Sequence, residues 1–289
     1  MRLLTWNCFG TPQSLLDALQ EQAVSGERFQ APEVHARCAN TDVLCLQELF
    51  SKEAQRLFDD LHKTHHPEAL RDHNAPHLWP PTLRGTGLGL LSRPPLRAPC
   101  LWNFRSASGL DRVVRKGALH VRLQVGTAEI DVVNAHLQAG YDAAAVKVRA
   151  AQLQELRHLV DQVGSPERDL LLCGDLNIDG LRHAREGVEY RLLSSLFRDF
   201  LDLGAQADEV TFDPHPEGNE LALRHEPNGW PQRLDYILHR PAAKRPVLRL
   251  RMLERVLDRP LTSSPPTGHR TAWASDHYGL LATFEAEEP

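Results

Sequence analysis

The chain has 289 residues, of which 42% are hydrophobic, and a formal net charge of -5. This length suits one large α/β domain or two small ones, and no Pro/Gly/Ser-rich linker or internal repeat divides it, so we expect a single domain over residues 1–289. The charge excludes the global basic footprint of a dedicated duplex-DNA binder, although 33 Lys and Arg residues leave room for a local basic face.

The five cysteines do not have the number or spacing of a disulfide scaffold. Cys8, Cys45 and Cys173 fall inside expected strands, where a thiol behaves as a small apolar residue. A strand follows Met1 at once, without a leader, and no apolar run reaches the ~20 residues that a membrane-spanning helix needs. We therefore expect a soluble, cytoplasmic monomer without a transmembrane segment.

In chain order, short apolar runs alternate with segments of helical periodicity. We expect strands at residues 3–8, 42–47, 87–92, 117–125, 128–135, 170–173, 234–239 and 278–284. We expect helices at residues 13–23, 32–39, 52–61, 143–163 and 191–200. Ser51 is an N-cap candidate for the third of these helices, and Gly126 marks the turn of a hairpin.

Two stretches show no clear period. Residues 63–86 carry several His and Pro residues, and we expect a long surface loop there. Residues 101–115 include an exposed-looking run at Trp102, Asn103 and Phe104. Since strands outnumber helices and occur both in pairs and singly, the sequence predicts a mixed α/β protein whose sheets are covered by helices.

The run Gly174-Asp175-Leu176-Asn177 follows a purely apolar strand. Gly174 permits a tight exit from that strand. Asp175 and Asn177 are two positions apart, so in extended backbone they would point the same way and could bind a metal and a phosphate oxygen or an attacking water. A strand-ending turn explains the same residue types equally well.

The run Ser275-Asp276-His277 precedes the last expected strand. An imidazole can take up a proton near neutral pH, which makes His277 a candidate general base. Asp235 is flanked by apolar strand residues and could fix the tautomer of His277 by a hydrogen bond. The structural alternatives are a surface histidine beside an N-cap-like aspartate and an outward-facing strand acid.

Three further polar residues stand at strand ends. Glu48 follows the second strand, where a carboxylate can hold Mg²⁺ or favour the dipole of the next helix. Asn7 can support Glu48 or serve as a turn residue, and His136 could donate to a phosphoryl oxygen. No single signal is specific, but their recurrence at strand ends predicts a divalent-metal hydrolytic site, and we expect a Mg²⁺-dependent phosphodiesterase.

Taken together, these motifs resemble the endonuclease/exonuclease/phosphatase superfamily, which has the deoxyribonuclease-I-like fold. The resemblance covers essentially the whole chain and implies an α/β fold, a four-layered sandwich in which two central mixed β-sheets are flanked by helices. It is carried in order by Trp6-Asn7, Gln47-Glu48, Asn134-Ala135-His136-Leu137, Gly174-Asp175-Leu176-Asn177, Leu234-Asp235-Tyr236 and Ser275-Asp276-His277.

Within that superfamily the chain looks most like the neutral sphingomyelinases. The similarity is carried by Asn7-Cys8-Phe9-Gly10, Lys116-Gly117, His136-Leu137-Gln138-Ala139, Val148-Arg149-Ala150-Ala151-Gln152-Leu153 and Cys173-Gly174-Asp175-Leu176-Asn177. Gly140 is a departure, because that pattern often has Glu before Tyr141. Trp79, Trp273 and the run at 102–104 are candidates for contact with lipid, with core or loop packing as the alternative.

The resemblance implies which residues bind the metal and which contact the phosphate. Glu48 would hold Mg²⁺ with help from Asn7, and Asp276 would complete the metal shell; Mn²⁺ or Co²⁺ could take the same place. His136 would stabilise charge in the transition state, and Lys116 could contact phosphate.

The resemblance also implies roles in proton transfer. His277 would be the general base, oriented by Asp235. Asp175 and Asn177 would position the nucleophilic water and a phosphate oxygen, or a second metal. The number of metals stays open, and Asp175 could replace His277 as the base.

The expected substrate is a phosphodiester, with a lipid headgroup favoured and peripheral membrane contact expected. A nuclease acting on DNA or RNA is the second hypothesis, against which the missing basic stripe argues mildly. A third is an inositol-phosphate phosphatase, which would need a basic cluster such as Arg105, Arg112, Arg115 and Lys116. A non-catalytic scaffold is disfavoured, because every expected ligand type is present.

Overall fold

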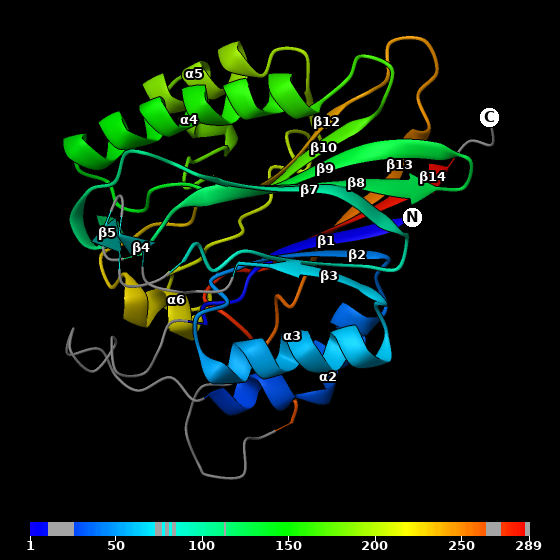
Figure 1. Ribbon diagram of the computed structural model, residues 1–289. Coiled ribbons are helices and arrows are strands. Elements are labelled where there is room, and N and C mark those ends of the chain that lie inside the picture. The colour runs from blue at the N-terminus through cyan, green and yellow to red at the C-terminus, as the bar shows by residue number, and fades with distance from the viewer. Residues whose placement is uncertain are drawn as a thin grey trace.

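Two six-stranded mixed sheets lie face to face, with helices on both outer surfaces, in a computed structural model of the chain (Figure 1). The structure describes residues 1–10, 26–72, 77–78, 81–82, 85–112, 114–263 and 273–286. The order of layers is helix, sheet, sheet, helix, which confirms the predicted four-layered α/β sandwich. The helix expected at residues 13–23 lies outside the described residues.

The first sheet combines strands from both ends of the chain. Its order is β13 (Leu248–Val256), β14 (Gly279–Ala286), β1 (Arg2–Asn7), β2 (Val43–Gln47), β6 (Gly89–Ser92) and β3 (Glu68–Arg71). Its one parallel pair is β1 and β2. The helices α2 (Pro32–Ala39) and α3 (Lys52–Thr64) cover its outer face (Figure 1). The cap of α3 is the predicted one, since the Ser51 side chain accepts a hydrogen bond from the backbone N of Ala54.

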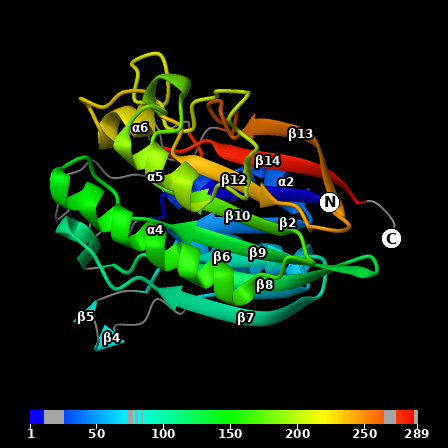
Figure 2. The same ribbon diagram turned by 90° about the horizontal axis from the view of Figure 1, so that it is seen from above.

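The second sheet is built from the middle of the chain. Its order is β11 (Leu201–Asp202), β12 (Asp235–Arg240), β10 (Leu170–Asp175), β9 (Ala128–His136), β8 (Gly117–Val125) and β7 (Leu96–Asn103). The helices α4 (Ala143–Val163) and α5 (Val188–Leu196) lie across its outer face (Figure 2). Smaller elements are η1 (Gly26–Gln30), η2 (Gly109–Arg112), η3 (Arg182–Ala184), α6 (Glu220–His225), β4 (His77–Leu78) and β5 (Pro81–Thr82).

The central strands are almost continuously apolar because both of their faces are buried. Alternate residues of β1 illustrate this: Leu3 packs between the two sheets, whereas Leu4 packs toward α2 and α3. In β10, Leu171 likewise faces the other sheet and Leu172 faces α4. The apolar runs in the sequence therefore reflect burial on two sides.

A buried polar bridge joins the two sheets. Asn134 of β9 donates from Nδ2 to the carbonyl oxygens of Leu46 and Gly89 in the first sheet, each at 3.0 Å. Gln47 of β2 donates from Nε2 to Asn134 Oδ1 at 2.7 Å and to Thr5 Oγ1 at 3.1 Å. Buried amides need such partners, so this bridge fixes how the sheets sit against each other.

The described part of residues 63–86 is not the long loop that the sequence predicts. The helix α3 continues to Thr64, and β3 then adds an edge strand to the first sheet by pairing with β6. The four residues of β3 are all half-buried. An edge strand of this kind has no clear alternation of polar and apolar residues, which explains why its periodicity was not visible.

The run at 102–104 is also less exposed than expected. Trp102 lies in β7, a strand that the sequence did not predict, and packs half-buried against the core under α4, where Phe104 is buried. Trp273 is buried against Leu221 and Tyr278. Trp79 lies outside the described residues. Core packing therefore accounts for the described candidates for lipid contact.

Two further elements differ from the prediction. The helix expected at 191–200 is α5, Val188–Leu196, and the chain then turns so that the buried rings of Phe197 and Phe200 pack together at 5.5 Å between centroids. The strand β13 was not predicted, because much of it is exposed. Within the described ranges, none of the helices combines the length and apolarity needed to cross a bilayer.

Candidate active site

The polar residues at the strand ends meet at one edge of the two sheets, on the side away from the N-terminus (left in Figure 1). In the second sheet, Asp175 pairs in register with His136 of β9 and with Asp235 of β12. In the first sheet, Asn7 ends β1 beside the end of β2, after which Glu48 follows. The strand registers therefore gather residues that are far apart in the sequence.

Contacts between these residues cross from one sheet to the other. Asn7 donates from Nδ2 to Asp175 Oδ2 at 3.0 Å and to Glu48 Oε1 at 3.4 Å. His136 Nε2 lies 3.4 Å from Asp175 Oδ2 and 4.0 Å from Glu48 Oε1. Asn7, Asp175 and His136 are buried, while the Glu48 side chain is 18% exposed. The cluster is thus buried except at Glu48, where it reaches solvent.

Unusual backbone conformations support this cluster. Gly174 has a φ of 130°, and a Cβ at this position would lie 1.9 Å from the carbonyl oxygen of Ala135, so the close approach of β9 and β10 requires glycine. Glu48 has a φ of 62°, in the left-handed region that side-chain-bearing residues rarely adopt. Strain of order 1–3 kcal/mol per residue is concentrated at functional sites, which favours a functional role for Glu48.

Asn177 does not share an extended strand with Asp175, in contrast to the prediction. The strand β10 ends at Asp175, and Asn177 has a left-handed φ of 52°. Its backbone N–H donates to Asp175 Oδ1 at 2.9 Å, and its Nδ2 donates to the carbonyl oxygen of Leu137 at 3.1 Å. A tight turn, rather than strand periodicity, therefore places these two side chains together.

The imidazole of His277 is held on several sides. Asp235 Oδ2 lies 2.8 Å from Nδ1, and the ring of Phe212 packs against the imidazole at 5.1 Å between centroids. Trp6 Nε1 donates to the backbone carbonyl of His277 at 3.3 Å. The second ring nitrogen, Nε2, lies 3.9 Å from Asp175 Oδ2. Asp235 thus orients His277 as the triad logic predicts, with Nε2 directed toward the carboxylate cluster.

The pKa values in the cluster reflect an excess of buried negative charge. Burial raises the pKa of Asp175 to about 7, with the charge of His277 opposing the rise and that of Asp235 adding to it. Burial lowers the pKa of His277, but the charges of Asp235 and Asp175 outweigh it and raise that pKa to about 10. The surrounding carboxylates therefore favour the protonated imidazole.

These residues fit a divalent cation. Glu48 and Asp175 carry the hard carboxylate oxygen atoms that Mg²⁺ prefers. Asn7 turns its Nδ2 toward both carboxylates, while its Oδ1 accepts from the backbone N–H of Phe9 at 3.0 Å. Asp175, Asp235 and His277 each place a potential ligand atom within 4.8 Å of the other two. Asp235 Oδ1 is buried and has no hydrogen-bond partner among the described residues. Added positive charge would stabilise these buried carboxylates, as the predicted Mg²⁺ site requires.

His136 and Lys116 form a pair beside the carboxylates. Burial, together with the positive charges of Lys116 and His277, holds the pKa of His136 well below its usual range. Lys116 Nζ lies 2.8 Å from His136 Nε2 and 3.5 Å from Asp111 Oδ1. An ammonium group can only donate, so the neutral imidazole accepts at Nε2. The sequence predicts His136 as a donor to phosphate; in this arrangement Lys116 is the donor of the pair.

Asp276 is buried close to this group but has partners of its own. Its Oδ2 lies 2.9 Å from Nδ1 of His225, the last residue of α6, and its Oδ1 accepts from Ser275 Oγ at 3.1 Å. Burial raises the pKa of Asp276, but the hydrogen bond from His225 and the charge of His277 lower it below its usual range. These contacts attach α6 to the site, and the metal role of Asp276 stays a prediction.

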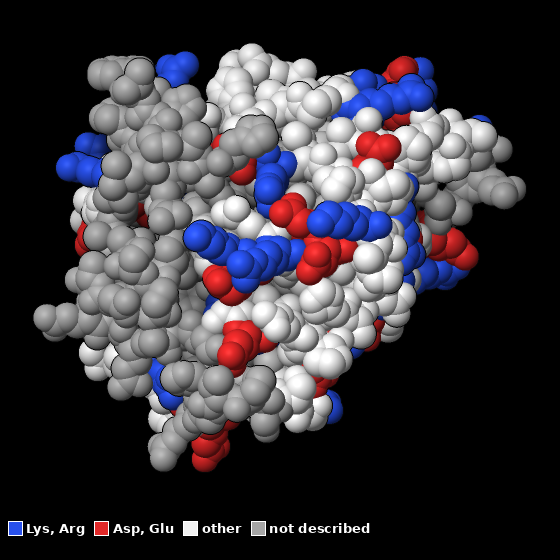
Figure 3. All heavy atoms as spheres, turned by 60° about the horizontal axis from the view of Figure 1, so that its bottom comes forward, with Lys and Arg blue, Asp and Glu red and all other residues white. Residues whose placement is uncertain are grey.

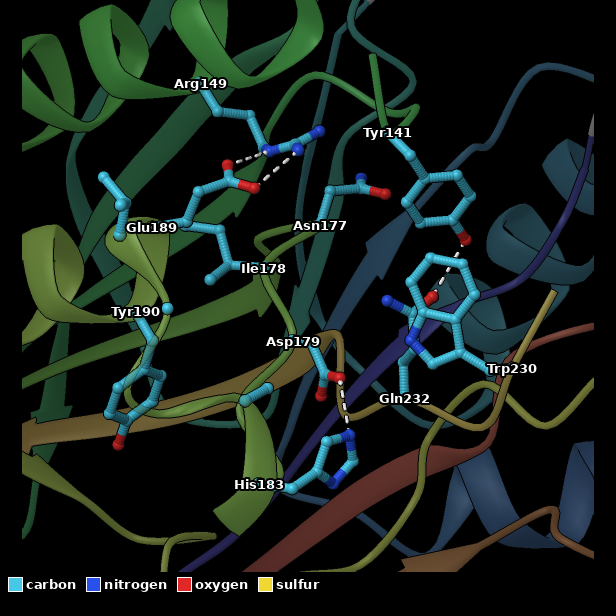
Figure 4. A pocket seen from close by; sticks show the side chains of 13 residues that line it. Tyr141, Arg149, Asn177, Ile178, Asp179, His183, Glu189, Tyr190, Trp230 and Gln232 are labelled. Carbon is cyan, nitrogen blue, oxygen red and sulfur yellow. Dashed lines mark hydrogen bonds and ion pairs between the residues drawn. The ribbon is translucent and has the colours of Figure 1, made fainter. Parts of the chain in front are cut away.

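A pocket of about 420 Å³ beside Asn177 contains residues that the sequence analysis did not single out (Figure 4). The lining includes Tyr141, Asp179, Trp230 and Gln232. These residues come from the segment after β9, the turn after β10 and the segment before β12. Of the motif residues, Asn177 and Arg149 also line this pocket, and Gly140, where the chain departs from the sphingomyelinase pattern, directly precedes Tyr141.

Comparison with known families gives a match over nearly the whole chain. Residues 4–277 match the family model described as Endonuclease/Exonuclease/phosphatase family. The chain is also 28% identical over 173 residues to a phospholipase C of Staphylococcus aureus. The matched region is 55% of this chain and 48% of that protein, so the chain spans about half the length of the curated relatives it matches.

Three solved structures illustrate the shared fold. A mutant of beta toxin from Staphylococcus aureus with bound magnesium ions has a TM-score of 0.76 at 18% identity, covering 97% of this chain and 98% of the other. Sphingomyelinase C from Streptomyces griseocarneus gives 0.71 at 24%, covering 98% of both chains. TDP2 of D. rerio, complexed with a single-strand DNA product, gives 0.70 at 17%, covering 99% of both chains. These likenesses confirm the deoxyribonuclease-I-like fold.

Proposed function

The chain belongs to the Endonuclease/Exonuclease/phosphatase family, and from this premise we propose that it is a Mg²⁺-dependent phosphodiesterase of phospholipase C type, acting on the headgroup of a phosphodiester lipid. The observation that carries the proposal is the cross-sheet cluster, in which Asn7 links the carboxylates of Glu48 and Asp175 and Asp235 orients His277. A carboxylate cluster beside an oriented imidazole provides both metal ligands and a proton acceptor.

Glu48 and Asp175 would hold the cation, with Asn7 linking the two carboxylates through its Nδ2. Bound there, Mg²⁺ would polarise a phosphoryl oxygen and neutralise the charge that develops on it. The beta toxin structure with bound magnesium ions supports this choice of metal by analogy of fold. Mn²⁺ or Co²⁺ would suit the same oxygen and nitrogen donors, and the number of ions is left to metal titration.

His277 would take the proton of the attacking water. This role requires the neutral imidazole, whereas the charges of Asp235 and Asp175 favour the protonated form. A cation among the carboxylates would offset that effect and lower the pKa of His277 toward neutrality. Asp235 keeps Nδ1 occupied at 2.8 Å, so that Nε2 remains the atom available for proton transfer.

Lys116 would donate to a phosphate oxygen, with His136 holding its ammonium in place. Lys116 Nζ lies between His136 Nε2 and Asp111 Oδ1, so its position is fixed by two partners. Asn177, whose backbone is anchored to Asp175, would contact a second phosphate oxygen. Fixed donors of this kind stabilise the charge of a phosphorane-like transition state.

The lipid headgroup is favoured over the other substrates by the relatives and by the surface. Phospholipase C and sphingomyelinase C stand among the similar proteins. Of the four basic residues that could recognise extra phosphates, Arg115 and Lys116 are buried while Arg105 and Arg112 are exposed, so they do not form one exposed cluster. Inositol phosphates are therefore disfavoured.

Nucleic acid is the second candidate, because TDP2 with its DNA product shares the fold. On the face of the molecule that Figure 3 shows, the described Lys and Arg side chains are interspersed with Asp and Glu rather than gathered into a stripe. A strand of nucleic acid needs a continuous positive track, so this face does not favour it.

A substrate panel tests the proposal. The chain would be incubated with Mg²⁺ and sphingomyelin in mixed micelles, lysophosphatidylcholine, supercoiled plasmid or inositol phosphates, with His277→Ala as the blank. We expect phosphocholine release that disappears in the variant. Plasmid nicking without lipid cleavage would reverse the ranking of substrates, and no hydrolysis of any of them would refute the proposal.

A further inference from the structure

Two aromatic rings form one wall of the pocket beside Asn177 (Figure 4). The centroids of Tyr141 and Trp230 are 4.9 Å apart, with the ring planes inclined at 38°. Tyr141 is fixed by a hydrogen bond from its hydroxyl to Gln232 Oε1 at 2.8 Å. Tyr141 and Trp230 are 44% and 46% exposed, so part of each ring remains accessible to a ligand.

Exposed apolar residues are concentrated at this pocket. Val188, which is 73% exposed, lines it together with Tyr141 and Trp230. These three are half of the six large hydrophobic residues that are exposed in the described part of the chain; the others are Leu101, Leu201 and Met252. A local concentration of exposed apolar side chains is typical of a binding site.

Negative charge surrounds the aromatic pair. Asp179 lines the pocket, and its Oδ2 lies 3.7 Å from the exposed His183. Burial raises the pKa of the Tyr141 hydroxyl, and the negative charges of Glu226 and Asp179 raise it further, while Arg149 opposes the rise. The potential at the rings therefore favours a cation.

The guanidinium in the lining is already paired with a carboxylate. Arg149 donates from Nε to Glu189 Oε1 at 2.7 Å and from Nη2 to Oε2 at 3.0 Å. Its Nη1 donates to the backbone carbonyls of Gln138 and Gly140. Since Arg149 is buried and fully engaged in these bonds, it serves as a fixed support of the pocket wall rather than as an anion receptor.

We propose that Tyr141 and Trp230 bind the quaternary ammonium group of phosphocholine, while its phosphate lies beyond Asn177 at the carboxylate cluster. A quaternary ammonium donates no hydrogen bond, so it is recognised by aromatic faces and nearby negative charge, with its methyl groups against apolar surface. A primary ammonium has N–H groups and would need hydrogen-bond acceptors where this pocket has an aromatic ring. The location of the phosphate rests on the proposed phosphodiesterase function.

Calorimetric titration of the whole protein at fixed Mg²⁺ tests this site without turnover. The probes are phosphocholine and phosphoethanolamine, which share the phosphate and differ in the methyl groups. We expect tighter binding of phosphocholine, and roughly 2- to 30-fold weaker binding of it in Trp230→Ala, the range for loss of a cation–π contact. Phosphoethanolamine binding should change little.

Matched variants separate the aromatic face from simple hydrophobicity. Trp230→Leu keeps an apolar side chain without a ring and should lose the preference for phosphocholine, whereas Trp230→Phe should retain most of it. Met252→Ala removes an exposed apolar side chain on β13 and should leave both affinities unchanged. Equal binding of the two probes to the unaltered protein, or a preference that survives Trp230→Leu, would overturn the proposal.

The source of the headgroup is decided with lipid substrates. If the site serves the lipid, Trp230→Leu should raise KM for sphingomyelin in mixed micelles more than it lowers kcat. An unchanged KM would overturn the role in substrate binding. If phosphocholine is preferred in the titration but no lipid is hydrolysed, the proposed function fails while the ammonium site stands. Lipid hydrolysis without any choline preference would support the proposed function and refute the ammonium site.

Discussion

Asp235, the first residue of β12, and His277, two residues before β14, form a 2.8 Å contact that joins the second sheet to the first. The hydrogen bond from Asn7 to Asp175 also crosses between the sheets, as does the approach of His136 to Glu48. The candidate site is therefore assembled where two layers meet, and each layer supplies one partner of these three contacts.

Replacing His277 with alanine should lower kcat by ~10²–10⁴, the range for loss of a general base. The reason is that Nε2 of His277 is the ring nitrogen directed toward the carboxylate cluster. Turnover would be measured at saturating Mg²⁺, with His65→Ala, an exposed histidine after α3, as the control. Near-normal turnover in His277→Ala would transfer the base role to Asp175.

Replacing Asp235 with asparagine should lower kcat by roughly 10²–10⁴ as well, because Asp235 acts through His277. The double variant Asp235→Asn/His277→Ala should then be little slower than His277→Ala alone, since residues that act as a unit are not additive. Fully additive losses in this cycle would mean that Asp235 contributes independently. The pH–rate profile of Asp235→Asn should also shift, which a purely structural role would not cause.

Replacing Glu48 with glutamine should raise the Mg²⁺ concentration required for half-maximal activity by at least about 10-fold, because a neutral amide replaces a carboxylate ligand. A Mg²⁺ titration of activity, checked by direct calorimetric binding, measures this. Glu167→Gln alters an exposed carboxylate after α4 and should leave the titration unchanged. The same curve for Glu48→Gln as for the unaltered protein would give Glu48 a structural role.

Replacing Asn134 with leucine should destabilise the fold by about 2–4 kcal/mol, since two buried carbonyls and the Gln47 amide would lose their partner. Urea unfolding gives the change in free energy of unfolding. Gln124→Leu removes a side chain that also donates to two carbonyls, but in the β8–β9 turn near solvent, and should cost less than about 1 kcal/mol. Equal decreases in the free energy of unfolding for the two variants would show that the bridge between the sheets stabilises the fold no more than the exposed hydrogen bonds of Gln124.

Acid should weaken the fold through Asp131, a buried residue of β9 away from the site. Burial raises its pKa, but the hydrogen bonds from His120 and Arg168 prevail and lower that pKa below its usual range. A carboxyl with a depressed folded-state pKa stabilises the fold above its unfolded value near 3.9, and this contribution is lost as pH falls through the folded value. The stability gap between the unaltered protein and Asp131→Asn should therefore narrow below about pH 4; parallel curves would contradict this.

The sequence identified the strands of the site well, because buried parallel and central strands are long apolar runs with distinctive ends. It also identified Glu48, Asp175, Asp235 and His277 as residues that the structure brings together. Edge strands such as β3 and β13 were missed, since half-exposed edges have no clean alternation. Their pairing is fixed by the neighbouring strand rather than by local preference.

Contacts between distant segments could not be read from the sequence. The residues from Asp175 to Asn177 are compatible with either an extended strand or a turn. The left-handed φ of Asn177 shows that they form a turn. His136 accepts from Lys116 instead of presenting the expected donor, because the two side chains are buried next to each other. Trp230 and Tyr141 lie 89 positions apart, by the difference of their numbers, and nothing local to either residue predicts that their rings meet.

The packing between the two sheets affects how inactive variants of this protein should be interpreted. A substitution at Cys45 or Cys173, which pack between the sheets, would alter the spacing of the layers and so separate active-site partners that it does not touch. Inactive variants that still fold should therefore map throughout the middle of the sandwich. Distance from the reacting atoms is a poor guide to which substitutions this protein can tolerate.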